Sequence, residues 1–181
     1  EVGGFKGHEV LLMPLGNLEG IAPGSEVTRS GDCLKVPVGE ALLGRILGGL
    51  GDPLDVETKG PLLCNTYYPV HREPPNALKR RRITEPLSVG IKAIDTVNTC
   101  GEGQRLGLFA AAGVGKSTLI GMIAKNTSAD INVIGLVGER GREVRDFLEK
   151  DLGEEGLSRS VIVVATSDQP SLVRAKAAYV A

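Results

Sequence analysis

The sequence predicts an α/β fold in which helices cover a parallel sheet, preceded by part of a small β-barrel. From Pro86 onward, apolar strand-like runs alternate with helical patterns, and a glycine-rich turn joins one such run to the helix that follows it. Before residue 38 the chain instead has short strand-like runs separated by glycines. With 181 residues, 41% of them hydrophobic, the chain has the size of one compact domain or one and a half.

The composition narrows the class of protein. Aromatic residues are only 3% and Trp is absent, so the core is expected to be aliphatic, as in buried parallel sheets. A net charge of −1 gives no general attraction to nucleic acid or to anionic membranes. The three widely spaced cysteines fit neither a disulfide framework nor a metal knuckle and favour a reducing compartment. Without a membrane-length apolar run or a signal peptide, we expect a soluble protein, and the absence of an initiator Met indicates a piece of a longer one.

The first half of the chain is divided into two predicted parts. Residues 1–38 are assigned to the C-terminal part of an N-terminal β-barrel domain, with strand-like runs at 10–15, 26–28 and 34–38. Residues 39–85 are assigned to a connecting segment that leads into the next domain, because polar and proline-bearing sequence dominates it. Within this segment a short helix is predicted, since four apolar residues fall at helical spacing before a glycine cluster: Leu42, Leu43, Ile46 and Leu47. The basic run 79–82 is interpreted as a solvated hinge in preference to an anion-binding patch.

In the second half, residues 86–181, predicted strands and helices alternate as in a parallel α/β domain. Strands are predicted at 106–109, 131–137 and 161–165, and helices at 116–125, 142–152 and 171–181. Such alternation implies right-handed crossovers between parallel strands. Ligands of such sheets bind at the carboxyl ends of the strands, so the functional residues are expected there.

The turn AAAGVGKS, residues 110–117, has the pattern of a P-loop, with Ala110 in place of the usual first glycine. Backbone N–H groups of such a loop surround a phosphate, and the start of the following helix adds its own unsatisfied donors. Lys116 is expected to reach the β and γ phosphates of ATP, and the Ser117 hydroxyl to ligate Mg²⁺. The predicted nucleotide-binding residues are Ala112, Gly113, Val114, Gly115, Lys116, Ser117 and Thr118.

A second cluster follows the strand predicted at 131–137. Three cations and three anions occupy residues 139–146. A solvated helix face accounts for the charges from Arg142 onward, but not for Glu139 and Arg140, which precede the helix at the strand end. In ATP hydrolysis a carboxylate there orients the attacking water, and a guanidinium stabilises charge on the phosphoryl oxygens. We therefore predict that Glu139 is catalytic, assisted by Lys116 and Arg140.

Asp168 is a third and weaker candidate, as a magnesium ligand following the strand at 161–165. An acidic ligand of this kind normally ends its strand, whereas Asp168 comes after two further residues and is followed by Gln-Pro-Ser, a helix start. The spacing therefore argues against this role.

Several segments together resemble the catalytic subunits of rotary ATPases: PLSVGIKAID (86–95), GQRLGLF (103–109), the P-loop, and GERGREVR (138–145). The likeness is greatest to the ATPase of bacterial type III secretion, and next to the flagellar export ATPase. DLGEEGL (151–157) and VVATSD (163–168) look more like the virulence-secretion branch than the flagellar one. The resemblance implies that 86–181 is the first part of a RecA-like ATP-binding domain, ending before its Walker-B strand.

The same resemblance implies roles for individual residues. Glu139 corresponds to the catalytic carboxylate, Arg140 lies near the γ-phosphate, and Glu143 supports the waters of the magnesium ion; Lys116 and Ser117 hold phosphate and metal. The Walker-B aspartate, the arginine finger, the adenine-contacting aromatic and the C-terminal domain would lie beyond Ala181. This stretch alone is therefore expected to bind nucleotide poorly and not to hydrolyse it.

The leading hypothesis is a homohexameric ATPase that strips chaperones from exported proteins and unfolds them, at the cytoplasmic face of the bacterial inner membrane. The implied partners are chaperone–effector complexes, a central stalk protein, a peripheral-stalk regulator and the inner-membrane export gate. A flagellar export ATPase is the first alternative. A non-catalytic nucleotide-binding subunit is another, although such subunits lack the acid at the position of Glu139. An RNA translocase would need a basic platform with aromatic side chains; residues 1–38 offer only Phe5, so nucleic acid is not expected as a partner.

Overall fold

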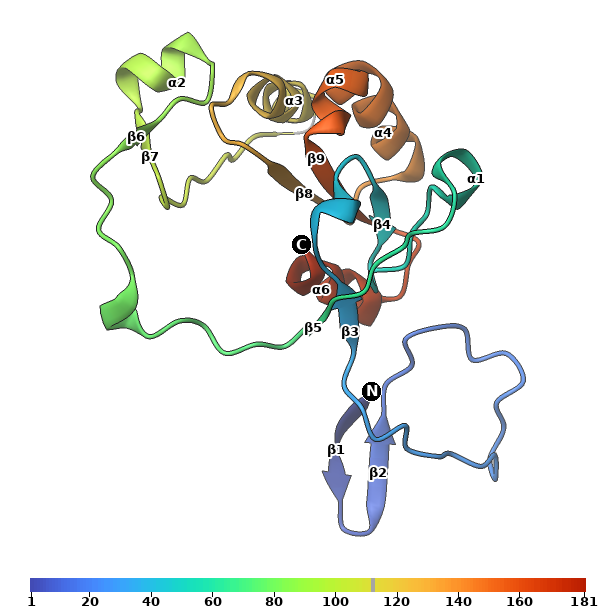
Figure 1. Ribbon diagram of the computed structural model, residues 1–181. Coiled ribbons are helices and arrows are strands. Elements are labelled where there is room, and N and C mark those ends of the chain that lie inside the picture. The colour runs from blue at the N-terminus through green and yellow to red at the C-terminus, as the bar shows by residue number, and fades with distance from the viewer. Residues whose placement is uncertain (112) are drawn as a thin grey trace.

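The computed structural model describes residues 1–111 and 113–181, and its centre is a three-stranded parallel sheet (Figure 1). The strand order is β4 (Ile46–Gly48), β9 (Ser160–Ala165), β8 (Asn132–Val137), and both neighbouring pairs are parallel. Strand β9 is a continuous apolar run buried on both faces, as expected for a middle strand. The predicted parallel sheet and the strands predicted at 131–137 and 161–165 are thus confirmed.

Helices cover both faces of this sheet, as Figure 1 shows. On one face lie α3 (Lys116–Asn126), α4 (Gly141–Asp146), a π-helical turn (Phe147–Leu152) and α5 (Gly153–Ser158), with a shared core of Ala124, Phe147, Leu152 and Ile162. On the other face lies α6 (Ser171–Val180), which packs its Ala177 against Val161, Val163 and Ala165. Alternate residues of β9 therefore belong to different cores, which is the two-residue period of a strand.

The helices predicted at 116–125 and 171–181 match α3 and α6. The helix predicted at 142–152 is present but irregular, because α4 passes into the π-helical turn after Asp146 and a further helix, α5, follows it. Among the described helices, none combines the length and apolar composition needed to cross a bilayer.

The strand predicted at 106–109 is wrong. Residues 104–111 have no regular structure, and Leu106 and Phe109 are 53% and 96% exposed. A strand needs a neighbouring strand to take up its backbone hydrogen bonds, and no described strand lies alongside this segment. Its apolar side chains were the only basis for the prediction.

The helix predicted around residues 42–47 is also wrong. A 3-10 turn (Glu40–Leu42) ends at once, and after Gly44, which has a φ of +74°, the chain enters β4. Neighbouring Ile46 and Leu47 then pack into the two different cores, on opposite faces of the sheet. A short buried strand with a continuous apolar run cannot be distinguished from a helix by periodicity alone.

A buried ion pair fixes the segment after β4. The Arg45 guanidinium donates to both carboxylate oxygens of Asp55, with its Nη2 atom 2.8 Å from Oδ1, and also donates to the Gly60 carbonyl. The carboxylate of Asp55 further accepts from the N–H of Ile46 at 3.0 Å. The pair therefore ties the first residue of β4 to the loop and short helix α1 (Val56–Lys59) that follow.

The N-terminal residues form small separate sheets. Strands β1 (Val2–Lys6) and β2 (Glu9–Leu12) make a hairpin, and β3 (Lys35–Pro37) pairs antiparallel with β5 (Tyr67–Pro69). The run predicted at 26–28 has no strand, and the residues that the structure describes contain no closed barrel. The predicted barrel is therefore not confirmed.

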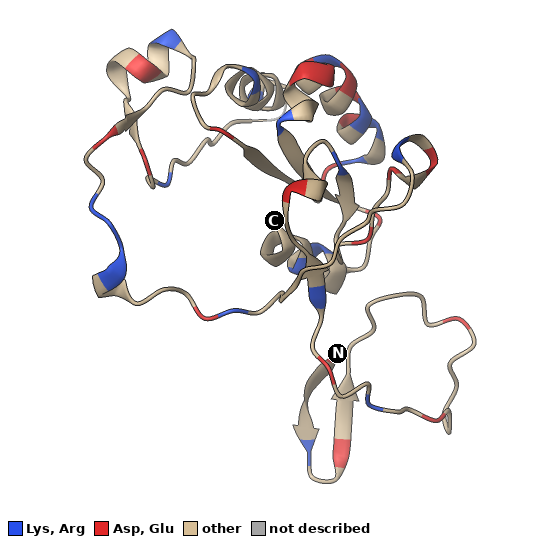
Figure 2. Cartoon of the chain, viewed as in Figure 1, with Lys and Arg blue, Asp and Glu red and all other residues tan. Residues whose placement is uncertain are grey.

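An extended segment connects β5 to the nucleotide-binding half. It passes through a 3-10 turn (Ala77–Lys79) to a small unit of β6 (Pro86–Leu87), α2 (Lys92–Val97) and β7 (Cys100–Gly101). The basic run 79–82 is fully exposed on this segment, and Figure 2 shows its blue ribbon there, away from the mixed charges on α4 and α5.

Candidate functional site

The predicted P-loop forms an exposed turn that leads directly into α3. Gly113 and Gly115 have φ angles of +78° and +95°, values that residues with a side chain rarely adopt. Gly115 is the N-cap of α3, and no side chain caps this described helix start, so its first N–H groups remain available to a ligand. Val114 and Thr118 are exposed on the same turn. Ala112 lies outside the described residues.

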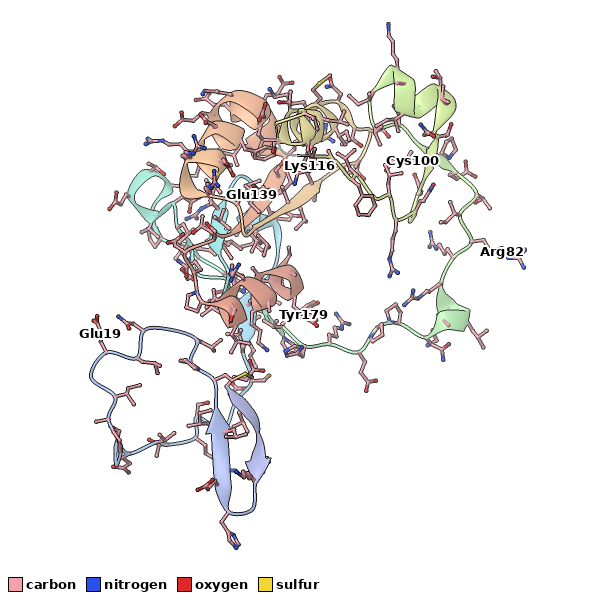
Figure 3. All side chains as sticks on the ribbon, turned by 180° about the vertical axis from the view of Figure 1, so that it is seen from behind. Glu19, Arg82, Cys100, Lys116, Glu139 and Tyr179 are labelled. Carbon is pink, nitrogen blue, oxygen red and sulfur yellow. The ribbon has the colours of Figure 1, made fainter. Side chains whose placement is uncertain are left out.

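The end of β8 brings Glu139 to this helix start. Gly138 turns the chain with a φ of +79°, and its N–H donates to the Ala165 carbonyl at 2.7 Å. The carboxylate of Glu139 then lies with its Oε1 atom 3.8 Å from Nζ of Lys116. Both side chains remain partly open to solvent, 34% and 44% exposed, and Figure 3 shows them on the same side of the molecule. An acid and a lysine from different elements thus share one site.

Glu143 occupies the first turn of α4. Its carboxylate accepts from the N–H of Arg140 at 3.4 Å and lies 3.6 Å from the guanidinium of the same residue. It also lies 3.8 Å from the guanidinium of Arg142. Arg140 is thus paired with Glu143 and does not line the pocket described next.

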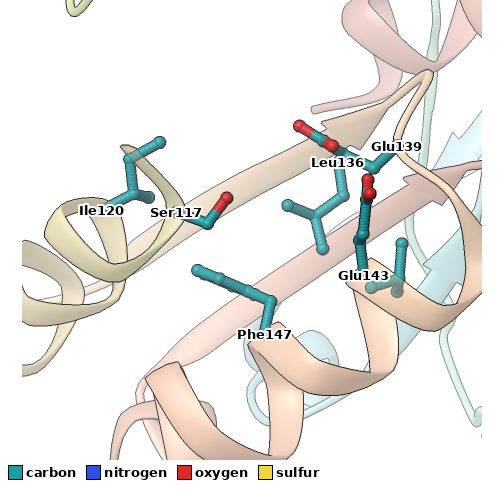
Figure 4. Close-up of a pocket in the computed structure, with 7 residues that line it drawn as sticks. Ser117, Ile120, Leu136, Glu139, Glu143 and Phe147 are labelled. Atoms are coloured by element: carbon teal, nitrogen blue, oxygen red, sulfur yellow. The ribbon is translucent and has the colours of Figure 1, made fainter. Parts of the chain in front are cut away.

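A small pocket lies between α3, the end of β8 and α4 (Figure 4). Its volume is about 30 Å³, enough for roughly one water molecule. The Ser117 hydroxyl and the carboxylates of Glu139 and Glu143 are its polar groups, and the apolar lining consists of Ile120, Leu136, Val144 and Phe147. Three of the predicted site residues are therefore brought to one cavity.

Phe147 was missed as a site residue because its apolar side chain fits a helix core equally well. It is 3% exposed and forms part of the pocket lining. The signal that would have found it is spacing, since Phe147 follows Glu143 by four residues and such pairs lie on the same helix face.

The donor set of this pocket fits Mg²⁺. The described residues contain no cluster of three or more His, Cys, Asp or Glu side chains that would hold a metal ion by themselves. Magnesium does not require one, since it keeps several waters and is held by one or two protein oxygens together with phosphate. A hydroxyl and two carboxylates meet that requirement.

Asp168 lies elsewhere. It lines a shallow depression with Gln169, Pro170 and residues 14–18, and it is not among the residues of the Ser117 pocket. A hydrogen bond from the Thr166 side chain, followed by one from its own backbone N–H, holds the pKa of Asp168 below its usual value. Its interactions are therefore with its own turn.

Comparison with known proteins identifies the family. The family model "ATP synthase alpha/beta family, nucleotide-binding domain" matches residues 90–181. A flagellum-specific ATP synthase of Bacillus subtilis (strain 168) is 57% identical over 183 residues, covering 100% of this chain and 41% of the relative. A type 3 secretion system ATPase of Xanthomonas euvesicatoria is 53% identical, covering 99% of this chain and 40% of the relative.

A solved structure gives the same result. The assembled ATPase EscN in complex with its central stalk EscO, from the type III secretion system of enteropathogenic E. coli, superposes with a TM-score of 0.88 at 46% identity. The match covers 99% of this chain and 44% of that one. The chain thus spans about two fifths of the length of the relatives it matches. With its P-loop and Glu139 inside the matched residues, the chain belongs to the ATP synthase alpha/beta family, and it is similar to a flagellum-specific ATP synthase and a type 3 secretion system ATPase.

Proposed function

We propose that the protein is an ATP-hydrolysing motor subunit of a bacterial type III protein secretion apparatus, coupling ATP turnover to chaperone release and unfolding of exported proteins. The observation that carries the proposal is the 3.8 Å approach of the Glu139 carboxylate to the Lys116 amine. This approach supports a site in which Glu139 orients water and Lys116 binds phosphate.

In this proposal each residue has a defined task. The N–H groups of the turn from Gly113 to Thr118 and the Lys116 ammonium bind the phosphates of ATP. Mg²⁺, when bound, neutralises phosphate charge, with Ser117 and Glu143 supplying oxygen donors. Glu139 accepts a hydrogen bond from the attacking water and orients it. Arg140 is assigned to the γ-phosphate, which requires its guanidinium to leave Glu143.

The domain assignment belongs to the same proposal. Residues 1–38 are the C-terminal part of an N-terminal β-barrel, 39–85 connect it to the ATPase domain, and 86–181 are the first part of a RecA-like domain. The family match from residue 90 onward supports the last of these. Strand β4 means that the connecting segment also contributes to the central sheet.

The proposed partners follow from the relatives. EscN is described as an assembled ATPase in complex with a central stalk, which supports a homohexamer with a central stalk protein for the present protein. Chaperone–effector complexes, a peripheral-stalk regulator and the inner-membrane export gate complete the proposal, with a location at the cytoplasmic face of the inner membrane and no nucleic acid partner.

A flagellar export ATPase is the second candidate, favoured by the 57% identity to the Bacillus subtilis relative. Deletion of the gene distinguishes the two: loss of secreted effectors with intact motility supports the first, and loss of flagella supports the second. Phosphate release from the full-length protein tests the activity common to both. Its absence would favour a non-catalytic nucleotide-binding subunit.

A further inference from the structure

The ends of β8 and β9 are joined beyond the last paired residues of the two strands. The regular register ends at Val137 and Ala165. Two more backbone hydrogen bonds follow: Gly138 N–H donates to the Ala165 carbonyl at 2.7 Å, and Ser167 N–H donates to the Glu139 carbonyl at 3.0 Å. The candidate catalytic acid is thus held through its main chain by the residue two positions after β9.

Ser167 makes this contact from a tight turn. The N–H of Gln169 donates to the Thr166 carbonyl at 3.0 Å, which closes a four-residue turn with Ser167 in its second position. The Ser167 side chain is exposed. Its main-chain N–H is therefore the group through which it acts.

Glu139 needs such a contact because the residue before it is a glycine in the left-handed conformation. Glycine has more backbone freedom than other residues, so the main chain directly before Glu139 is less restricted in its φ and ψ angles. The bond from Ser167 fixes the carbonyl of Glu139 while its carboxylate extends toward Lys116. We infer that Ser167 is a positioning residue for Glu139, acting through its main-chain N–H; the inference rests on the proposed ATPase function.

Ser167→Pro in the full-length protein removes this one donor. Proline is favoured at the second position of such a turn. A misplacement of about 1 Å lowers turnover by roughly 100-fold. We expect kcat to fall about 10- to 100-fold while KM and the ATP Kd change less than about twofold. Ser167→Ala retains the N–H and is expected to keep kcat within about twofold of the parent.

Replacement of Ser167 by lactic acid, which converts the amide to an ester, removes the same N–H with no proline ring. It is compared with Ser167→Ala, and its thermal midpoint is measured beside its kcat. This variant decides the matter if Ser167→Pro does not fold. A kcat loss in the ester variant with an unchanged ATP Kd supports the inference.

A double-mutant comparison with Glu139→Gln distinguishes a positioning role of Ser167 from a general structural role. In a Glu139→Gln background, Ser167→Pro is expected to change residual turnover less than about twofold, because the group it positions is already absent. A parental kcat in the proline and ester variants, an equal loss in Ser167→Ala, or an undiminished effect in the Glu139→Gln background would each overturn the inference while leaving the ATPase assignment intact. A parent protein that releases no phosphate overturns the proposed function, and the inference with it.

Discussion

Nζ of Lys116, at the start of α3, lies 3.8 Å from Oε1 of Glu139, just beyond the end of β8. With the two side chains 44% and 34% exposed, such a pair contributes at most about 1 kcal/mol to stability. Substitutions at either residue are therefore expected to report on activity and not on folding.

Glu139→Gln removes the carboxylate and keeps the shape of the side chain. In the full-length protein we expect ATP binding to be retained and kcat to fall by about 10²- to 10⁴-fold, the usual contribution of a positioned general base. Phosphate release and binding of a fluorescent ATP analogue measure the two effects. Glu149→Gln, the same change in a surface pair with Arg145, is the control. Parental turnover in Glu139→Gln would remove Glu139 from the mechanism.

Lys116→Ala is expected to weaken ATP binding. Hydrogen bonds to a charged group contribute about 1.5–3 kcal/mol, so the ATP Kd should rise roughly 10- to 100-fold. Equilibrium titration with a fluorescent nucleotide gives the Kd directly. Lys125→Ala, on the last turn of the same helix, should leave the Kd unchanged; similar losses in both variants would point to helix stability instead.

Ser117→Ala and Asp168→Asn test the metal assignment. Because Ser117 lines the pocket with the two carboxylates and Asp168 does not, only Ser117→Ala should raise the Mg²⁺ concentration for half-maximal turnover, by roughly tenfold for the loss of one ligand. Asp168→Asn should leave that concentration within about twofold of the parent. The reverse pattern would make Asp168 the magnesium ligand.

Asp55→Asn tests the buried pair with Arg45. Removing one partner of a buried ion pair costs about 3–5 kcal/mol, so the free energy of unfolding should fall by that amount, and calorimetry should show a clearly lower thermal midpoint. Asp32→Asn breaks an exposed pair with Lys35 and should change stability much less, because solvent screens that pair. Equal effects of the two substitutions would show that burial of Asp55 is unimportant.

The Asp55–Arg45 pair also predicts that the free energy of unfolding depends on pH. Burial raises the pKa of Asp55, but hydrogen bonds from Arg45 and from the Ile46 N–H more than offset this and leave the pKa below its usual value. The folded protein therefore binds the Asp55 proton less readily than the unfolded chain. Its stabilisation is complete above the unfolded pKa, near 4, and is lost as the pH falls through the lower folded pKa. Denaturant titrations between pH 6 and about pH 3 should show a shallower loss of stability in Asp55→Asn than in the parent.

The sequence predicted the residues of the candidate site better than it predicted the strands. The end of strand 131–137 and the helix start after the P-loop were expected to meet, and Ser117, Glu139 and Glu143 do share one pocket, although the strand expected before the P-loop is absent from the described residues. Whether they act as predicted there is what the substitutions test. The resemblance to export ATPases is confirmed by the family match and the relatives.

The errors have a common physical cause, which is that strands depend on distant partners. Ile46–Gly48 looked helical from its own residues, and only pairing with β9, more than a hundred residues later, makes it a strand. Leu106, Leu108 and Phe109 looked like a strand but have no described partner. The contact of Ser167 with Glu139 was equally invisible, because a main-chain N–H leaves no mark on residue type.

Strand β9 connects helix α6 to the main chain of Glu139. One face packs against α6, and the turn at its tip holds the backbone of Glu139. A load applied to α6 that shifts β9 along its axis would displace that acid relative to the lysine on α3. Helix α6 and the main chain of Glu139 are thus attached to the same strand.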